Sequence, residues 1–293
     1  MLCCASCGIA EVDDIKLKTC TACKSARYCS IKCQKEHRPK HKKACKKRAA
    51  ELRDEILFRQ PESTHYGDCP ICCLPLSIDP KKSILMPCCC KQICRGCEYA
   101  IDVRELQESR VQKCPFCRHP VPEEQNEMEN NVMKRVEVND PIAVRQMGML
   151  CMERRDADGA VEYSKRAAEL GDAGAHFNLS LMYRMGTGVE KDEKKELYHL
   201  EEAAIGGHPS ARNNLGYLEC RDGRQERAVK HWIIAAILGC DSSMNTLRDM
   251  YAVGYVRKED FAAALSAHQA AVDATKSPQR EVAEAALHWS SNF

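Results

Sequence analysis

The chain of 293 residues has few aromatic residues, little net charge and no long apolar run. Aromatic side chains make up 5% of the sequence and the formal net charge is +2, so the composition suits closely packed small helices better than a β-sandwich. No stretch approaches about 18 uninterrupted apolar residues, so we expect no membrane span. The first 14 residues have no basic n-region and no apolar h-region, so we expect an intracellular protein, cytoplasmic or nuclear.

What the chain does contain is cysteine, with 21 residues of which 18 lie before residue 118. In a reducing compartment, closely spaced Cys-x2-Cys pairs indicate zinc ligands and not disulfides. Segments of about 40 residues rarely fold on an apolar core alone. We therefore expect metal to stabilise the amino-terminal third, whereas the rest of the chain is long enough to bury a core.

Eight candidate ligands in four closely spaced pairs occupy residues 4–45. They are Cys4, Cys7, Cys20, Cys23, Cys29, Cys33, His41 and Cys45. Eight thiolate or imidazole ligands satisfy two tetrahedral zinc ions. This spacing, together with the string ARYC that ends at Cys29, resembles the MYND zinc finger over the whole segment.

The MYND resemblance implies two interleaved zinc sites and a peptide-docking surface. One zinc would be held by Cys4, Cys7, Cys29 and Cys33, and the other by Cys20, Cys23, His41 and Cys45. Each ion would then join two separated stretches, so that metal binding is also folding. MYND fingers often dock proline-containing peptides; Gln34 matches a position that the family uses, but Arg38 replaces its usual tryptophan. Cys3 and His37 fall outside the ligand spacing.

A basic run overlaps the end of this segment. It consists of Lys40, Lys42, Lys43, Lys46, Lys47 and Arg48. We expect a solvated helix face beside a zinc site, with a nuclear-import or nucleic-acid patch as the alternative. Aromatic residues for base stacking are not interleaved with the basic, cysteine-rich segments, so nucleic acid is not the expected partner.

A second cysteine array runs from Cys69 to Cys117. Its pairs are Cys69/Cys72, Cys94/Cys97 and Cys114/Cys117, with Cys88, Cys89 and Cys90 between the first two. The array resembles a RING finger, closest to the all-cysteine type in the RING subunit of the cytoplasmic deadenylase complex. The resemblance implies a central helix at 98–110, and one zinc on Cys69, Cys72, Cys94 and Cys97. A second zinc would be held by Cys114, Cys117 and two of the triplet, which makes about four zinc ions per chain.

The triplet leaves its two ligands undecided. The usual histidine position holds Lys91, which is a poor zinc ligand. Cys88 and Cys90 project to the same side if the chain is extended there, whereas alignment through the string QIC favours Cys89, so all three remain candidates. We expect that Cys73 does not bind zinc.

The RING resemblance implies a function without a catalytic residue in this chain. A RING finger docks a ubiquitin-conjugating enzyme and orients its thioester-linked ubiquitin. The family's docking positions correspond to Ile71 and Pro115. Its arginine that bridges the conjugating enzyme and ubiquitin corresponds to Arg118, and a planar guanidinium with five donors suits that bridge. The alternative is a structural RING-like fold that recruits no conjugating enzyme.

The last part of the chain repeats itself every 32 to 36 residues. Strings beginning at Ala167, Ala203 and Ala235 correspond, and an incomplete copy begins at Asn139. Such a period predicts stacked helix pairs, in which glycines such as Gly171, Gly207 and Gly239 fit helix ends. The string from Arg184 to Lys195 resembles Sel-one-like repeats, relatives of tetratricopeptide repeats, whose concave face docks peptides or proteins.

Several isolated residues of the repeats are expected in the core. Trp232, His231 and Tyr217 occupy repeat positions that favour packing over binding, and Cys151, Cys220 and Cys240 are expected to be buried thiols.

The predicted fold is mostly α, with two small zinc modules followed by an α/α superhelix. The expected segments are a MYND-type finger (1–46), a helical linker (47–68), a RING-type finger (69–120), a linker or short helix (121–138), repeats (139–277) and a cap (278–293). The predicted function is a RING-type ubiquitin ligase whose MYND finger and repeats select protein or peptide partners. The alternatives are a non-catalytic scaffold and, more weakly, a thiol-based redox or metal-handling protein.

Overall fold

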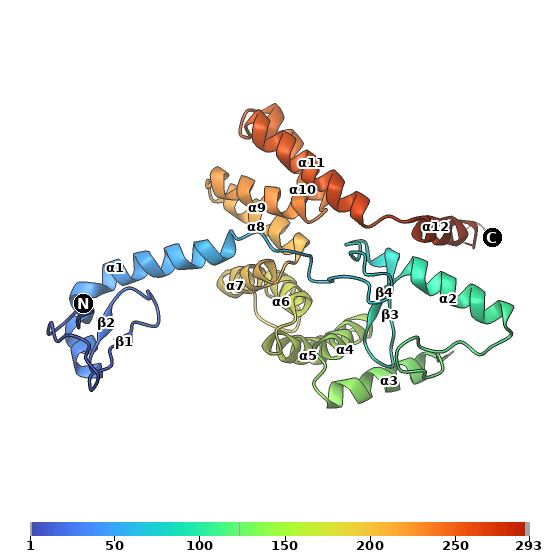
Figure 1. Ribbon diagram of the computed structural model, residues 1–293, viewed down its shortest axis with the longest axis horizontal. Coiled ribbons are helices and arrows are strands. Elements are labelled where there is room, and N and C mark those ends of the chain that lie inside the picture. The colour runs from blue at the N-terminus through green and yellow to red at the C-terminus, as the bar shows by residue number, and fades with distance from the viewer. Residues whose placement is uncertain (1, 123, 291–293) are drawn as a thin grey trace. The chain divides into compact units, whose positions relative to one another are not determined.

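The computed structural model describes residues 2–122 and 124–290, and the chain in it is mostly α-helical (Figure 1). It divides into two compact units, Met1–Arg59 and Gln60–Phe293. Across the described residues, we find no helix with the length and apolar character needed to cross a bilayer.

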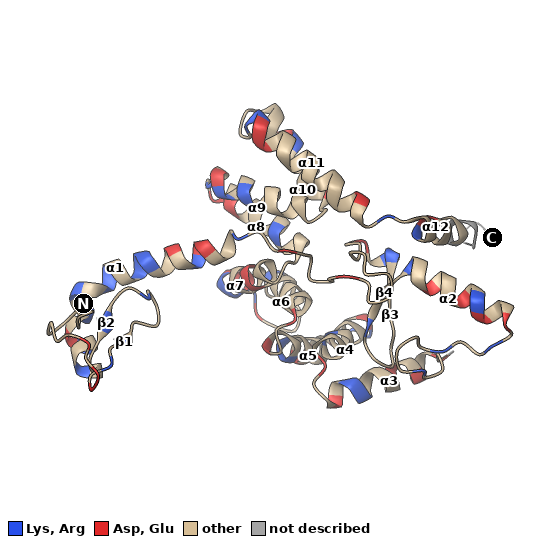
Figure 2. Cartoon of the chain, in the orientation of Figure 1, with Lys and Arg blue, Asp and Glu red and all other residues tan. Residues whose placement is uncertain are grey.

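The first unit combines a short hairpin with one long helix. Strands β1 (Lys18–Thr19) and β2 (Arg27–Tyr28) pair antiparallel, and helix α1 spans Ile31–Leu57. Ser30 caps α1 by accepting a hydrogen bond from the Cys33 N–H at 3.2 Å, which sets that cysteine in the first turn. The basic residues gather on the first two thirds of α1 and acidic ones follow (Figure 2); the lysines of the basic run are exposed, as expected for a solvated face.

The second cysteine array forms a compact module at the start of the second unit. A short 3-10 turn (Pro80–Lys82) precedes strands β3 (Ser83–Leu85) and β4 (Gln92–Cys94), which pair antiparallel with Ile84 opposite Ile93. Helix α2 spans Arg95–Gln107, so the prediction of 98–110 was three residues late. The cause is Cys94, whose Sγ accepts from the Cys97 N–H at 3.4 Å and caps the helix earlier. Helix α3 (Gln125–Glu137) follows.

The rest of the unit is a stack of antiparallel helix pairs (Figure 1). The helices are α4 (Pro141–Glu153), α5 (Ala157–Glu169), α6 (Ala173–Met185), α7 (Glu193–Ile205), α8 (Pro209–Arg221), α9 (Gln225–Ile237), α10 (Asp241–Ala252) and α11 (Lys258–Ala274). Helix α12 (Pro278–Ser290) follows the stack and packs against α2. The pairs α4/α5, α6/α7 and α8/α9 pack most extensively, and each pair covers its neighbour.

Local sequence explains where these helices begin and end. Asp140 and Asp172 each cap a helix by accepting backbone N–H bonds, and the pairs can approach because Ala203 and Ala235 are fully buried. The predicted glycine ends are confirmed: Gly171, Gly207 and Gly239 have φ of +87°, +80° and +89°, in the left-handed region that glycine enters at little cost.

The predictions for single core residues are confirmed in part. Trp232 and His231 are buried at 1% and 0% exposure, but the prediction for Tyr217 was wrong, since it is 50% exposed. The Tyr217 ring covers Trp232 from outside, edge to face at 5.4 Å, and its hydroxyl bonds Thr246 at 2.8 Å. Two isolated thiols, Cys151 and Cys240, are buried; the third, Cys220, is half-buried.

The cysteine module and the repeats share apolar contacts within the second unit. Cys90 belongs to the core formed by helices α3 to α6, and Leu85 packs against it. Upstream of the module, the His65 N–H donates to the Gly207 carbonyl at 3.1 Å, and the His65 ring stacks on His208 at 4.1 Å. The cysteine module is therefore packed against the repeats.

Candidate metal centres

Four clusters of ligand residues form in the described part of the chain, each with its ligand atoms within 4.8 Å of one another. Two clusters lie in the first unit and two in the second unit. They are Cys4/Cys7/Cys29/Cys33, Cys20/Cys23/His41/Cys45, Cys69/Cys72/Cys94/Cys97 and Cys88/Cys89/Cys114/Cys117.

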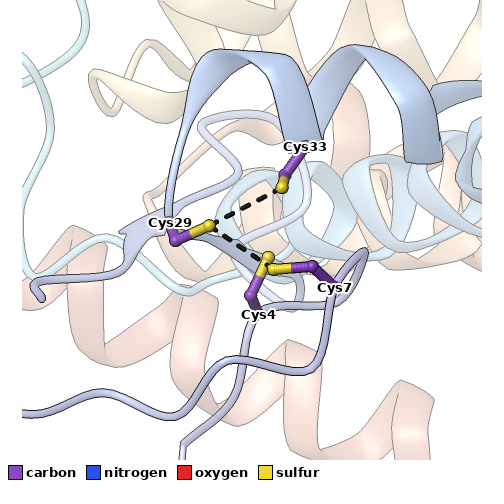
Figure 3. Close-up of side chains that lie close together, drawn as sticks. All are labelled: Cys4, Cys7, Cys29 and Cys33. Atoms are coloured by element: carbon purple, nitrogen blue, oxygen red, sulfur yellow. Dashed lines mark hydrogen bonds between the residues drawn. The ribbon is translucent and has the colours of Figure 1, made fainter.

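The spacing of the sulfur atoms fits zinc. A Zn–S bond of about 2.3 Å places the sulfurs of a tetrahedron about 3.8 Å apart. In the first cluster the Cys29 sulfur lies 3.6 Å from the sulfur of Cys7 and 3.6 Å from that of Cys33 (Figure 3). A disulfide would need about 2 Å, and the cysteines of the four clusters form no disulfides.

The second cluster combines three thiols with one imidazole. The sulfurs of Cys20 and Cys45 lie 3.7 Å apart, and His41 Nε2 lies 3.3 Å from the Cys23 sulfur. His37 is not among the ligands, but its Nδ1 lies 3.2 Å from the Tyr28 hydroxyl and its ring stacks on His41 at 5.5 Å. This support for the ligand imidazole could have been found from the spacing of His37 and His41, which lie one helical turn apart.

The two clusters of the second module show the same spacing. In one, the sulfurs of Cys72 and Cys94 are 3.8 Å apart. In the other, the Cys114 sulfur lies 3.6 Å from that of Cys89, and the sulfurs of Cys117 and Cys88 are 3.3 Å apart. Each cluster joins cysteines that are more than 20 residues apart in sequence, so a bound ion would tie the loops to the β3–β4 hairpin and α2.

A shared backbone turn shapes the ligand pairs. The residue that follows the second cysteine of a Cys-x2-Cys pair has a left-handed φ at Gly8, Lys24, Cys73 and Arg118, with values of +77°, +56°, +55° and +62°. In each turn its N–H donates to the carbonyl of the first cysteine, at 2.8 to 3.0 Å. This turn aims both sulfurs at one point.

Cys90 occupies the same position after Cys89. Its φ is +52°, and its N–H donates to the Met86 carbonyl at 2.8 Å. The side chain turns away from the cluster into the repeat core and is 2% exposed, and this burial raises the pKa of the Cys90 thiol to about 12. The structure thus brings Cys88 and Cys89 into the cluster and leaves Cys90 and Cys73 outside it.

Backbone and side-chain donors stabilise thiolates, which are the form that binds metal. Backbone N–H groups of Cys7 and Cys29 lower the pKa of Cys4 to about 6. Burial raises the pKa of Cys72, but donors from the Leu74 backbone and the Arg280 side chain outweigh it and lower the pKa to about 7. Arg280 was not a candidate site residue in the sequence, because no local pattern connects it with cysteine.

The predicted docking positions lie on the surface of the second module. Ile71 is 39% exposed, Arg118 is exposed and Pro115 is half-buried. In the first unit, Gln34 and Arg38 are both exposed on α1.

Comparisons with known proteins agree with two of the three modules. Residues 4–45 match the MYND finger, and residues 145–172 and 173–208 match the Sel1 repeat. No curated protein sequence matches the chain significantly.

Among solved structures, a Sel1 repeat protein from Oxalobacter formigenes is similar at 28% identity and a TM-score of 0.45, over 51% of this chain and 66% of that one. A protective antigen of uropathogenic Escherichia coli strains, which displays an SLR fold, is similar at 22% identity and a TM-score of 0.41, over 57% of this chain and 36% of that one.

The chain therefore contains a MYND finger at residues 4–45 and Sel1 repeats at residues 145–208, and modules of both kinds generally bind other proteins. Its cysteine clusters offer four possible zinc sites, two in the MYND finger and two in a further module, which we call the 69–117 module.

Proposed function

We propose that this protein is a RING-type ubiquitin ligase whose MYND finger and Sel1 repeats select its partners. Zinc in the 69–117 module would fix the loops around Ile71 and Pro115, and no chemical step would pass through the metal. The chain's contribution to the reaction would be orientation of the thioester, which can account for large rate gains without a nucleophile.

The observation that carries the proposal is that the three positions predicted for docking all reach the surface of a module that contains two interleaved ligand clusters. Ile71 lies between two ligands of one cluster, and Pro115 lies between two ligands of the other. Arg118 follows the last ligand in the left-handed turn at φ +62° and is exposed, so its side chain is accessible to a partner. A non-glycine residue there costs roughly 1 kcal/mol.

A groove beside Pro115 supports a protein partner. It has a volume of about 610 Å³ and runs between α2 and α3. Its lining includes Ile101 and Met128, and the carboxylates of Asp102 and Glu105. An apolar groove with a carboxylate edge suits a partner that presents an apolar side chain next to basic ones.

An autoubiquitination assay with a panel of conjugating enzymes tests the proposal. We expect Ile71→Ala and Arg118→Ala to abolish chain formation while zinc content stays unchanged. The matched controls are Val111→Ala and Arg110→Ala, because both residues are exposed in the same module, at 68% of the Val111 residue and 70% of the Arg110 side chain. Absence of ubiquitin chains with every conjugating enzyme would refute ligase activity.

A non-catalytic scaffold is the second candidate, and exposed tyrosines on the repeats favour it. Tyr198, Tyr217 and Tyr255 are 53%, 50% and 59% exposed, and aromatic residues are enriched where proteins bind one another. A groove of about 520 Å³ beside Tyr217 also contains Arg184 and Arg221. In a scaffold, Tyr217→Ala would abolish partner binding while Ile71→Ala would have no effect on it.

A further inference from the structure

Helix α12 packs against the first turn of α2 in backbone-to-backbone contact. Gly96 is the contact point: a Cβ there would lie 2.8 Å from Cγ and 2.9 Å from Cα of Arg280. The Gln279 side chain donates to the Gly96 carbonyl at 3.0 Å, and Lys82 pairs with Glu284 at 2.8 Å. Any larger residue at position 96 would push α12 away from the module.

This contact places the guanidinium of Arg280 beside the Cys69/Cys72/Cys94/Cys97 cluster. Its Nη1 donates to the carbonyls of Pro75 and Thr275, both at 2.7 Å. Its Nη2 donates to the Leu74 carbonyl at 3.1 Å and to the Cys72 sulfur at 3.3 Å. Arg280 and Cys72 are 208 residues apart in sequence, yet one side chain joins the cluster, the loop that follows it and the end of α11.

The charge of this guanidinium requires an anion. Arg280 is 8% exposed, and a buried cation without a counter-charge costs several kcal/mol. Carbonyl oxygens offer dipoles but no net charge. Four thiolates around Zn²⁺ carry a net charge of −2, and the Cys72 sulfur, 3.3 Å from Nη2, would bring that charge into contact with Arg280. A zinc-loaded cluster can therefore neutralise Arg280.

We infer that zinc in the Cys69/Cys72/Cys94/Cys97 cluster and docking of α12 on α2 are coupled through Arg280. Zinc bound there holds α12 in place, and docked α12 in turn retains that zinc and covers the Cys72 sulfur. The reciprocity is required, since two events that share an interaction energy stabilise each other by the same factor. The inference rests on zinc occupying this cluster and not on ligase activity.

The role of Arg280 is tested by zinc retention in the full-length, zinc-loaded chain. A chelator is added in excess and bound zinc is counted by native mass spectrometry. Outer partners of metal ligands typically contribute 10- to 100-fold to metal affinity, so we expect Arg280→Ala to lose one zinc about 10-fold faster or more. The other ions leave as in the wild type. Alkylation before unfolding should reach Cys72 first in this variant.

Two further variants separate charge from packing. Arg280→Met keeps the length and apolar stem of the side chain but not its charge, and we expect it to lose zinc like Arg280→Ala. Arg280→Lys restores the charge with fewer donors and should rescue retention in part. The matched control is Arg257→Ala, because Arg257 is exposed and pairs only locally with Asp260, at 2.8 Å. Wild-type zinc retention in Arg280→Met would overturn the inference.

The reciprocal half is measured on the wild-type chain, so it does not depend on a variant that folds. Hydrogen exchange of residues 278–286 is followed with zinc bound and after partial chelation. We expect α12 to lose protection together with the first zinc from the 69–117 module, while α8 and α9 keep theirs. Unchanged protection of α12 after that zinc has left would also overturn the inference, whatever the outcome of the ubiquitination assay.

Discussion

The cysteine triplet at 88–90 offers the sharpest test of the zinc sites. We predict that Cys88→Ala and Cys89→Ala each reduce the zinc content from four ions to three, whereas Cys90→Ala leaves it at four. The structural reason is the left-handed turn: Cys88 and Cys89 aim at Cys114 and Cys117, whereas Cys90 itself has the left-handed φ and is buried among repeat residues.

The expected energies differ by an order of magnitude. A structural zinc contributes about 10–16 kcal/mol to folding of a small domain, and a site with one thiolate missing forfeits much of it. Removal of the Cys90 sulfur only deletes one buried atom from a packed core, where comparable deletions cost about 0.5–1.5 kcal/mol. Cys90→Ala should therefore fold normally with a slightly lower melting temperature.

Zinc per chain is measured by elemental analysis after exhaustive dialysis, and folding is measured by urea titration of the same samples. Cys73→Ala is the matched control, since Cys73 occupies the equivalent turn position at φ +55° but is exposed. Loss of one zinc in Cys90→Ala with four retained in Cys89→Ala would refute the assignment. It would mean that the backbone after Met86 is extended and presents Cys88 and Cys90.

Three further predictions concern stability. Burial beside Arg212 lowers the pKa of His231 to about 3, so the native state binds fewer protons than the unfolded chain and is destabilised as pH falls below about 6.5. Between pH 6.5 and 5 the wild type should lose about 1.6 kcal/mol more stability than His231→Phe in urea titrations; equal losses in the two proteins would show that His231 is not held as a buried neutral imidazole. Gly216→Ala should destabilise by about 1–3 kcal/mol, because its Cβ would lie 2.6 Å from Cε2 of Trp232. Trp232→Phe in the same chain should relieve part of that loss, and additive losses in the double-mutant cycle would rule out the clash. Chelation should expose Met1–Arg59 to protease, since the small core of this first unit is made largely of ligand cysteines, while a fragment containing α4–α10 survives. An intact first unit after chelation would contradict metal-dependent folding.

Ligand spacing and repeat period were the features that could be predicted without a structure. A Cys-x2-Cys pair is a local turn, so its two sulfurs converge whatever the rest of the chain does, and the MYND finger follows from residues 4–45 alone. The helix pairs follow in the same way from small residues and glycines that recur every 32 to 36 residues, because each such feature acts within its own helix end or pair.

The sequence by itself determined which residues are capable of binding zinc and where the helical repeats lie, because both depend on short-range spacing. Only the tertiary structure decided that Cys90 packs into the repeat core, that Tyr217 covers Trp232 from outside, and that Arg280 reaches Cys72 across 208 residues. Each of these depends on which surfaces meet after the chain has folded. Burial and charge compensation result from these contacts between segments that are distant in sequence, and no local pattern of residues encodes them.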